Sequence, residues 1–184
     1  MKKLIIVLGI CMLINNTIDG QIVENVPSNN KPNHIAIGYH VNDFSHDFGF
    51  GLGATSPYFA FKKLAVRVSY NFQRLNYIDT TRYKSVGYKN IKIGLLSSAF
   101  ILNKSIRLYG EAGVAVLVCP AAITSKNTSY AGYGLFGFEF FISKGFSYYI
   151  ELGAIGTTTT ADNIASVPIF SNGFTTTAGL RVYL

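Results

Sequence analysis

The sequence has few charged residues, 14% of its 184, yet it lacks the long apolar run that a membrane-spanning helix requires. Such a helix needs about 20 mostly apolar residues, and nowhere in this chain do about 18 of them follow one another. The length suits one domain with a real core and is short for two. If a membrane is involved, a helix does not span it.

Long runs of one charge are also missing. The net charge is +7, but no stretch of five or more basic residues occurs. Nucleic-acid-binding proteins usually concentrate their basic residues on one face or in one segment. We therefore expect no nucleic-acid partner, and contact with lipid phosphates is the more natural interpretation of the positive charge.

The N-terminus carries Lys2 and Lys3, followed by an apolar stretch from Leu4 to Ile14 and then by polar residues. This order is typical of a secretory signal peptide. We expect residues 1–20 to be a signal peptide cleaved near Gly20, so that the mature chain has a net charge of +6. Residues 21–33 are rich in Asn and Pro and are expected to form a flexible periplasmic leader.

Cysteine is scarce, with Cys11 inside the apolar stretch and Cys119 far downstream. Export would leave Cys119 alone, so no internal disulfide is possible. We interpret Cys119 as a small packing residue rather than a catalytic thiol. Lipoprotein processing at Cys11 is an alternative, but Ile10 is too bulky for the position before a lipidated cysteine.

From His34 onward, apolar residues alternate with polar or small ones in segments of about ten, the period of β-strands. Short turns are expected at 62–63, 103–105 and 143–145, and longer loops at 78–84, 119–129 and 160–173, with a short first loop at 43–46. This alternation of short and long connections is typical of outer-membrane barrels, whose turns are periplasmic. We therefore predict an all-β fold over residues 34–184, an eight-stranded antiparallel up-and-down transmembrane β-barrel. The expected strands are 34–42, 47–61, 64–77, 85–101, 106–118, 130–142, 146–159 and 174–184.

The charges in the interiors of the expected strands all fall on the less apolar face of their strand. A charge facing lipid costs about 2 to 4 kcal/mol near mid-bilayer. Seven such charges on the lipid side would cost roughly 10 to 25 kcal/mol, comparable with or above a typical total stability of about 5 to 15 kcal/mol. We therefore predict that they point into the lumen and form a salt-bridge network. These residues are Arg67, Lys92, Arg107, Glu111, Glu139, Glu151 and Arg181.

Glu139 and Glu151 flank the same turn at similar depth and are expected to lie side by side, with Arg107 or Arg181 relieving their repulsion.

The opposite faces of the strands are continuously apolar, which argues against a soluble lipocalin-like barrel. Aromatic residues gather toward strand ends, as interfacial girdles would require. They include Tyr58, Phe59, Phe100, Phe140, Phe146 and Tyr148 near the turns and Phe48, Phe72, Tyr77, Tyr88, Tyr130 and Phe174 near the loops. Pro57 conflicts with a regular second strand, because proline lacks the N–H that strand pairing needs, so we expect a bulge or irregular hydrogen bonding there.

A hairpin repeat aligns Lys104 to Gly113 with Lys144 to Gly153, and the chain ends in a strand that resembles a terminal assembly signal. With the signal peptide, these features resemble the small outer-membrane β-barrel family of the OmpX-like and OmpA-transmembrane-domain-like type. The resemblance implies an outer-membrane location and recognition by the barrel assembly machinery, although the family usually ends in an aromatic residue. The residues of the expected assembly signal are Gly179, Leu180, Val182, Tyr183 and Leu184.

Such a fold does not specify an activity. We expect a non-enzymatic, monomeric envelope protein without a cofactor, structural or interaction-mediating, with its loops at the cell surface and a surface partner that the sequence does not identify. A small porin is an alternative, although eight strands leave room only for side chains. A lipid A-modifying enzyme using Ser45, His46 and Asp47 is a weaker one, and a metal site at His40 and His46 lacks a third ligand.

Basic residues also occur near the loop side, where they could contact lipopolysaccharide phosphates. Asp43, Asp47, Asp79 and Asp162 dilute this charge. The candidate lipopolysaccharide contacts are Arg74, Arg82, Lys84, Lys89 and Lys126.

Overall fold

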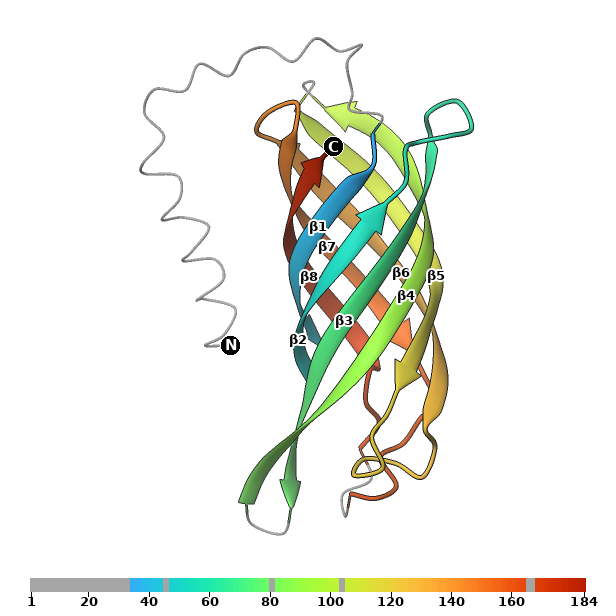
Figure 1. Cartoon of the computed structure of the whole chain (residues 1–184), viewed down its shortest axis with the longest axis vertical. Helices are drawn as coiled ribbons and strands as arrows, with labels where there is room; N and C mark the ends of the chain where they lie inside the picture. Colours follow the sequence, from blue (N-terminus) through green and yellow to red (C-terminus); the bar gives the residue numbers. More distant parts are fainter. Residues whose placement is uncertain (1–33, 45–46, 80–81, 103–104, 165–167) are drawn as a thin grey trace, which may run out of the picture.

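The structure is a computed structural model that describes residues 34–184 except 45–46, 80–81, 103–104 and 165–167. Eight strands close into one antiparallel barrel in chain order, with the first strand paired to the last (Figure 1). The strands are β1 (Ala36–Phe44), β2 (Asp47–Thr55), β3 (Leu64–Asp79), β4 (Arg82–Leu102), β5 (Ile106–Val118), β6 (Thr128–Phe141), β7 (Phe146–Gly156) and β8 (Gly173–Tyr183). The predicted fold class, strand number and order are confirmed. The expected signal peptide and leader, residues 1–33, lie outside the described residues.

Alternation along each strand separates two environments. In β2, residues 47, 49 and 51 are buried, whereas Phe48, Phe50 and Leu52 are about half exposed. The neighbouring β3 repeats this pattern, with Val66, Val68 and Tyr70 outside and Arg67, Ser69 and Asn71 inside. The outside of the barrel is therefore an apolar belt and the inside is largely polar, as the period-two pattern predicted. In the described part of the chain, no helix is long and apolar enough to cross a membrane.

The β2–β3 connection differs from the prediction. We expected the second strand to reach residue 61, but β2 ends at Thr55 and residues 56–63 form the turn. Ala60, Phe61 and Lys62 all have positive φ, at 45°, 60° and 60°. Pro57 therefore lies just outside the strand. Pairing resumes after it at a single bridge between Phe59 and Leu64, and residues 56–58 oppose only residues 65–66, so the pairing around Pro57 is irregular, as expected. A register shift also lies between Ser98 and Phe100 of β4.

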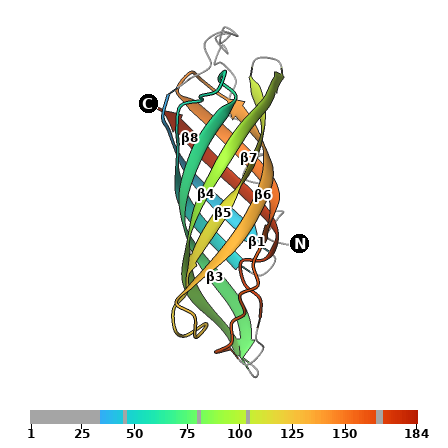
Figure 2. The same cartoon turned by 90° about the vertical axis from the view of Figure 1, so that its right-hand side faces the viewer.

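The β3–β4 connection also differs. Residues 78–84 were expected to form a long loop, but regular pairing continues to Asp79 and Arg82. β3 and β4 are consequently the longest strands, with 16 and 21 residues. Their hairpin extends beyond the other strands at the end opposite the short turns, and Figures 1 and 2 both show this projection.

Three of the aromatic residues assigned to the outer girdles lie on the inner side instead. Tyr58 and Tyr88 are 8% and 1% exposed, and Tyr77, on the inward row of β3, packs against the same buried cluster as Tyr88. Other members of the predicted girdles do lie outside, such as Phe48, Tyr130 and Phe174. Tyr58 belongs to the turn, where the alternation of strand residues does not define an inner and an outer side. Tyr88 lies on the inward face of β4.

Glycine makes the polar interior possible where two strands carry long side chains toward the same place. Gly51 faces inward, and a Cβ built there would lie 2.7 Å from both Nε2 of His40 and the backbone oxygen of Tyr70. It would also overlap Oδ1 of Asn71. The absence of a side chain at Gly51 thus leaves space for the His40 and Asn71 side chains.

We predict that Gly51→Ala lowers the stability of the barrel by about 1 to 3 kcal/mol, the usual cost of overpacking. Gly132→Ala is the matched control, because a Cβ at Gly132 meets nothing within 4 Å. Urea unfolding midpoints in detergent micelles measure both. Equal midpoints for the two variants would contradict the close packing at Gly51.

Candidate functional site in the barrel interior

The predicted charges of the strands all line the inside of the barrel. Their exposed fractions are 8% or less. Such burial requires partners, since a desolvated charge without one is very unfavourable. The seven residues are Arg67 (β3), Lys92 (β4), Arg107 and Glu111 (β5), Glu139 (β6), Glu151 (β7) and Arg181 (β8).

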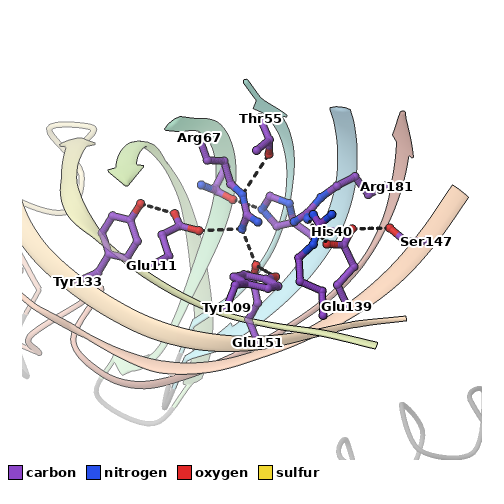
Figure 3. A network of polar contacts seen from close by, with 12 residues as sticks. His40, Thr55, Arg67, Tyr109, Glu111, Tyr133, Glu139, Ser147, Glu151 and Arg181 are labelled. Atoms are coloured by element: carbon purple, nitrogen blue, oxygen red, sulfur yellow. Dashed lines mark hydrogen bonds and ion pairs between the residues drawn. The ribbon is translucent and has the colours of Figure 1, made fainter. Parts of the chain in front are cut away.

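Arg67 joins two carboxylates across the lumen. Its Nη1 lies 2.9 Å from Oε2 of Glu111 and 2.5 Å from Oε1 of Glu151. The hydroxyl of Tyr109 donates to Glu151 at 2.5 Å, and that of Tyr133 donates to Glu111 at 2.6 Å. We call these five residues the Arg67 cluster; Figure 3 shows them converging from four strands. The ammonium group of Lys92 lies 5.4 Å from the centre of the Tyr133 ring.

Glu139 is the centre of a second group nearer the short turns, the Glu139 cluster. Its Oε2 lies 3.0 Å from Nη1 of Arg181 and 3.3 Å from Nη1 of Arg107. Its Oε1 accepts hydrogen bonds from the hydroxyls of Tyr183 at 2.5 Å and Ser147 at 2.6 Å. Four groups from three other strands therefore surround one carboxylate that has no exposed surface.

The two glutamates flanking the β6–β7 turn are thus not direct partners. Glu151 lies opposite Gly137, and Glu139 lies opposite Tyr149, so they are offset by two residues. Each carboxylate has its own arginine: Glu139 contacts both Arg107 and Arg181, as the sequence suggested, whereas Glu151 uses Arg67. Repulsion between them is relieved separately at each site.

Aromatic rings support the guanidinium groups. The Arg181 guanidinium lies 4.5 Å from the Tyr149 ring centre, and that of Arg107 lies 4.7 Å from the Tyr58 ring centre. Gly179 faces Tyr149 across β7 and β8, and a Cβ there would lie 2.5 Å from Cζ of that ring. Gly179 thus lets the ring lie flat against the wall, where it stabilises the cation through its π face.

A neutral polar layer lies next to the Arg67 cluster. His40 Nε2 is 2.6 Å from Oδ1 of Asn71, and Asn71 in turn donates to Asn90 at 2.7 Å. Asn42 donates to Asn71 at 3.2 Å and accepts from Gln73 at 2.6 Å. This amide layer (His40, Asn42, Asn71, Gln73 and Asn90) was not predicted from the sequence. The sequence feature that could have predicted the layer is that these polar residues lie on the same strand faces as the buried charges.

An apolar cluster covers the interior at the loop end. Side chains of the β5–β6 and β7–β8 loops pack there against inward-facing residues of β3 and β4. We call this cluster the apolar cap: Leu75, Tyr88, Leu117, Cys119, Ile123, Ala161, Ile164 and Phe170. Sequence analysis did not find it because its members lie far apart in the chain and largely outside the alternating pattern.

Polar contacts hold the cap loops in place. The Ser125 hydroxyl and amide donate to the Asp162 carboxylate at 2.5 and 2.9 Å, and this lowers the pKa of Asp162 to about 2. The Asn163 side chain donates to the backbone oxygen of Ala121 at 2.6 Å. Burial raises the pKa of Cys119 to about 11, so its thiol is protonated at neutral pH, as befits a packing residue.

Of the residues considered for catalysis or metal binding, the structure describes Asp47 and His40. Asp47 is buried at the edge of the cap, where it accepts hydrogen bonds from the Tyr88 hydroxyl at 2.6 Å and the Ser171 amide at 2.9 Å. Ser45 and His46 lie outside the described residues. His40 belongs to the amide layer, and among the described residues no three His, Cys, Asp or Glu side chains group together for a metal ion.

The candidate lipopolysaccharide contacts separate into different places. Arg74 and Lys89 are exposed on the outward faces of β3 and β4, whereas Lys84 lies on the inward row of the same hairpin and Lys126 lies in the β5–β6 loop. The side chain of Arg82 lies outside the described residues. In the expected assembly signal, Tyr183 faces inward, while Leu180, Val182 and Leu184 face outward, and Gly179 accommodates the Tyr149 ring.

No protein-family model matches the sequence, and no curated protein sequence matches it. Among solved structures, the N-terminal β-barrel domain of Pseudomonas aeruginosa OprF is similar, with a TM-score of 0.57 and 11% identity, over 83% of this chain and 98% of that one. Two further similar structures are the outer membrane protein OprG of the same organism and the attachment invasion locus protein Ail of Yersinia pestis. Their TM-scores are 0.49 and 0.43, with 11% and 16% identity, over 85% and 82% of this chain and 95% of each of theirs. The likeness to the OprF domain shows that this chain has the fold of a small eight-stranded barrel domain.

We predict that Glu139→Gln destabilises the barrel by about 3 to 5 kcal/mol, because it leaves two buried arginines without their carboxylate. Asp43→Asn is the control for loss of one negative charge, since Asp43 is exposed. Thermal unfolding in detergent, followed by heat-dependent gel migration, compares the two. If Glu139→Gln unfolds at the wild-type temperature, the Glu139 cluster does not stabilise the interior.

Proposed function

We propose that this chain is exported, loses residues 1–20, and acts as a monomeric, non-enzymatic protein of the outer membrane that presents its loops at the cell surface. The apolar belt supports a membrane location, because exposed apolar side chains of this extent require lipid or an equally large apolar surface. The terminal strand supports insertion by the barrel assembly machinery. The role is structural or interaction-mediating, and the surface partner is a protein or lipid that meets the loops and the projecting hairpin.

The observation that carries the non-enzymatic, non-conducting part of this proposal is the filling of the lumen. Two ion-paired clusters, the amide layer and the apolar cap follow one another from the short turns to the loops. An eight-stranded barrel has an interior that side chains can fill. A solute would have to break the buried Arg67 and Glu139 pairs and then displace the cap.

A small pore is the second candidate function, because charges of both signs line the lumen. It differs from the closed barrel in one measurable respect. The closed barrel requires the apolar cap to stay packed, whereas a pore requires a continuous water path past Leu75 and Phe170, which are 0% and 1% exposed.

We expect no stable conductance steps when the purified protein is inserted into planar lipid bilayers. A variant with Arg67→Ala and Phe170→Ala, which removes a lumen cation and a cap ring, is expected to show brief openings more often than wild type. Steady, ion-selective conductance steps from the wild-type protein would contradict the closed-barrel proposal and support the pore.

Orientation is tested separately by labelling introduced cysteines in whole cells with a membrane-impermeant maleimide. Thr158→Cys, in the β7–β8 loop, is expected to react, whereas Lys62→Cys, in the β2–β3 turn, is expected to react only after lysis. Both positions are exposed, and the native Cys119 is only 5% exposed, so the wild-type background is low. If only Lys62→Cys is labelled in intact cells, the orientation is the opposite of the one proposed. If neither variant is labelled in intact cells, the proposed outer-membrane location is contradicted.

A further inference from the structure

Two cations lie side by side on the outward face of the barrel at its loop end. Arg74 of β3 pairs with Phe48 of β2 and Gly87 of β4, and Lys89 of β4 pairs with Phe72 of β3. Residues 72 and 74 of β3 and residues 87 and 89 of β4 therefore form one patch of the outer wall, in which Arg74 and Lys89 are diagonal neighbours. Diagonal neighbours on adjacent strands are about 7 to 8 Å apart, so two long basic side chains can reach the same small anion.

Aromatic rings form the floor of this patch. The rings of Phe50 and Phe72 are 5.6 Å apart. Phe72 leans over Gly87, where a Cβ would lie 2.8 Å from Cζ of the ring. The ring therefore fills the space over Gly87 and lies between the strand positions of the two cations. Phe48, Phe50 and Phe72 are 45%, 49% and 37% exposed, continuous with the apolar belt.

The other charged residues near the loop end lie apart from Arg74 and Lys89. Lys84 belongs to the inward row of the hairpin, and Lys126 belongs to the β5–β6 loop. Asp43 lies outward on the row of Arg74, but Phe48 of β2 stands between them. Two strand spacings of about 4.8 Å separate their backbones. The anion site thus lies on the border where the apolar belt meets the loop end.

We propose that Arg74 and Lys89 bind a phosphate monoester of the lipid A headgroup of lipopolysaccharide, with the acyl chains lying along Phe48, Phe50 and Phe72. This proposal rests on the outer-membrane orientation proposed above. A phosphate monoester carries about −1.5 to −2 charge near neutral pH, which matches two cations. A phosphodiester of an ordinary phospholipid carries one negative charge, which a single cation matches. Arg74 supplies the planar fork that suits phosphate oxygens, and Lys89 supplies a point charge.

The test measures binding of bis-phosphorylated lipid A to the refolded full-length mature protein in detergent by native mass spectrometry. The double variant Arg74→Gln, Lys89→Gln is expected to weaken binding at least about tenfold, as loss of charge-assisted hydrogen bonds implies. The matched control is Lys62→Gln, Lys63→Gln, which removes two exposed cations at the opposite end and is expected to change binding less than about twofold. Heat-dependent gel migration verifies that all three proteins are folded.

Two further ligands identify the source of the phosphate. Fully dephosphorylated lipid A is expected to bind wild type as weakly as the double variant binds lipid A, and phosphatidylglycerol is expected to show no dependence on Arg74 and Lys89. Equal binding of lipid A to the double variant and the control would overturn the site. If phosphatidylglycerol depends on the pair as strongly as lipid A does, the lipid A assignment is wrong. These outcomes are separate from the labelling experiment, which tests the orientation itself.

Discussion

Pairing of buried charge is the constraint on which the interior of this barrel depends. Closing eight strands leaves an inner space that side chains fill, so every charge directed inward loses most of its water. In this barrel, arginine side chains pair with carboxylates of other strands. Arg67 of β3 contacts carboxylates of β5 and β7, and Glu139 of β6 is contacted from β5 and β8. Because these ties cross the lumen, they connect opposite walls of the barrel as well as neighbouring strands.

The face of each strand was predictable from sequence because a shift by one residue exchanges inside for outside. Placing Glu139 or Arg181 against lipid is so unfavourable that the local pattern decides their side. Partners were harder to predict. Tilted strands in a closed sheet bring β3 next to β7 across the lumen, so Arg67 meets Glu151 although 84 residues separate them. The contact between Arg67 and Glu151 therefore cannot be predicted from the spacing of residues within a strand or hairpin.

Predictions failed where the period-two pattern does not apply. Tyr58 lies in a turn, where the alternation of strands does not define a side, and its ring packs under Arg107. The regular β2–β3 ladder ends at Thr55 because Pro57 follows, and only one bridge, Phe59 to Leu64, precedes the three turn residues with positive φ. The apolar cap was missed for a related reason: Ile123, Ile164 and Phe170 come from connections that are polar on average, and only their folding over Leu75 and Tyr88 brings them together. Local polarity describes the composition of such loops but not their tertiary packing.

The position of Arg181 in β8 has a consequence for the closure of the barrel. Arg181 and Tyr183 lie in the final part of β8, and both contact Glu139. Any intermediate made of the first seven strands holds that carboxylate with Arg107 and Ser147 alone, and β1 lacks its second neighbour as well. Pairing of β8 thus completes both the seam with β1 and the set of groups that neutralise Glu139. Barrel closure and charge compensation are therefore coupled, because both need the same strand.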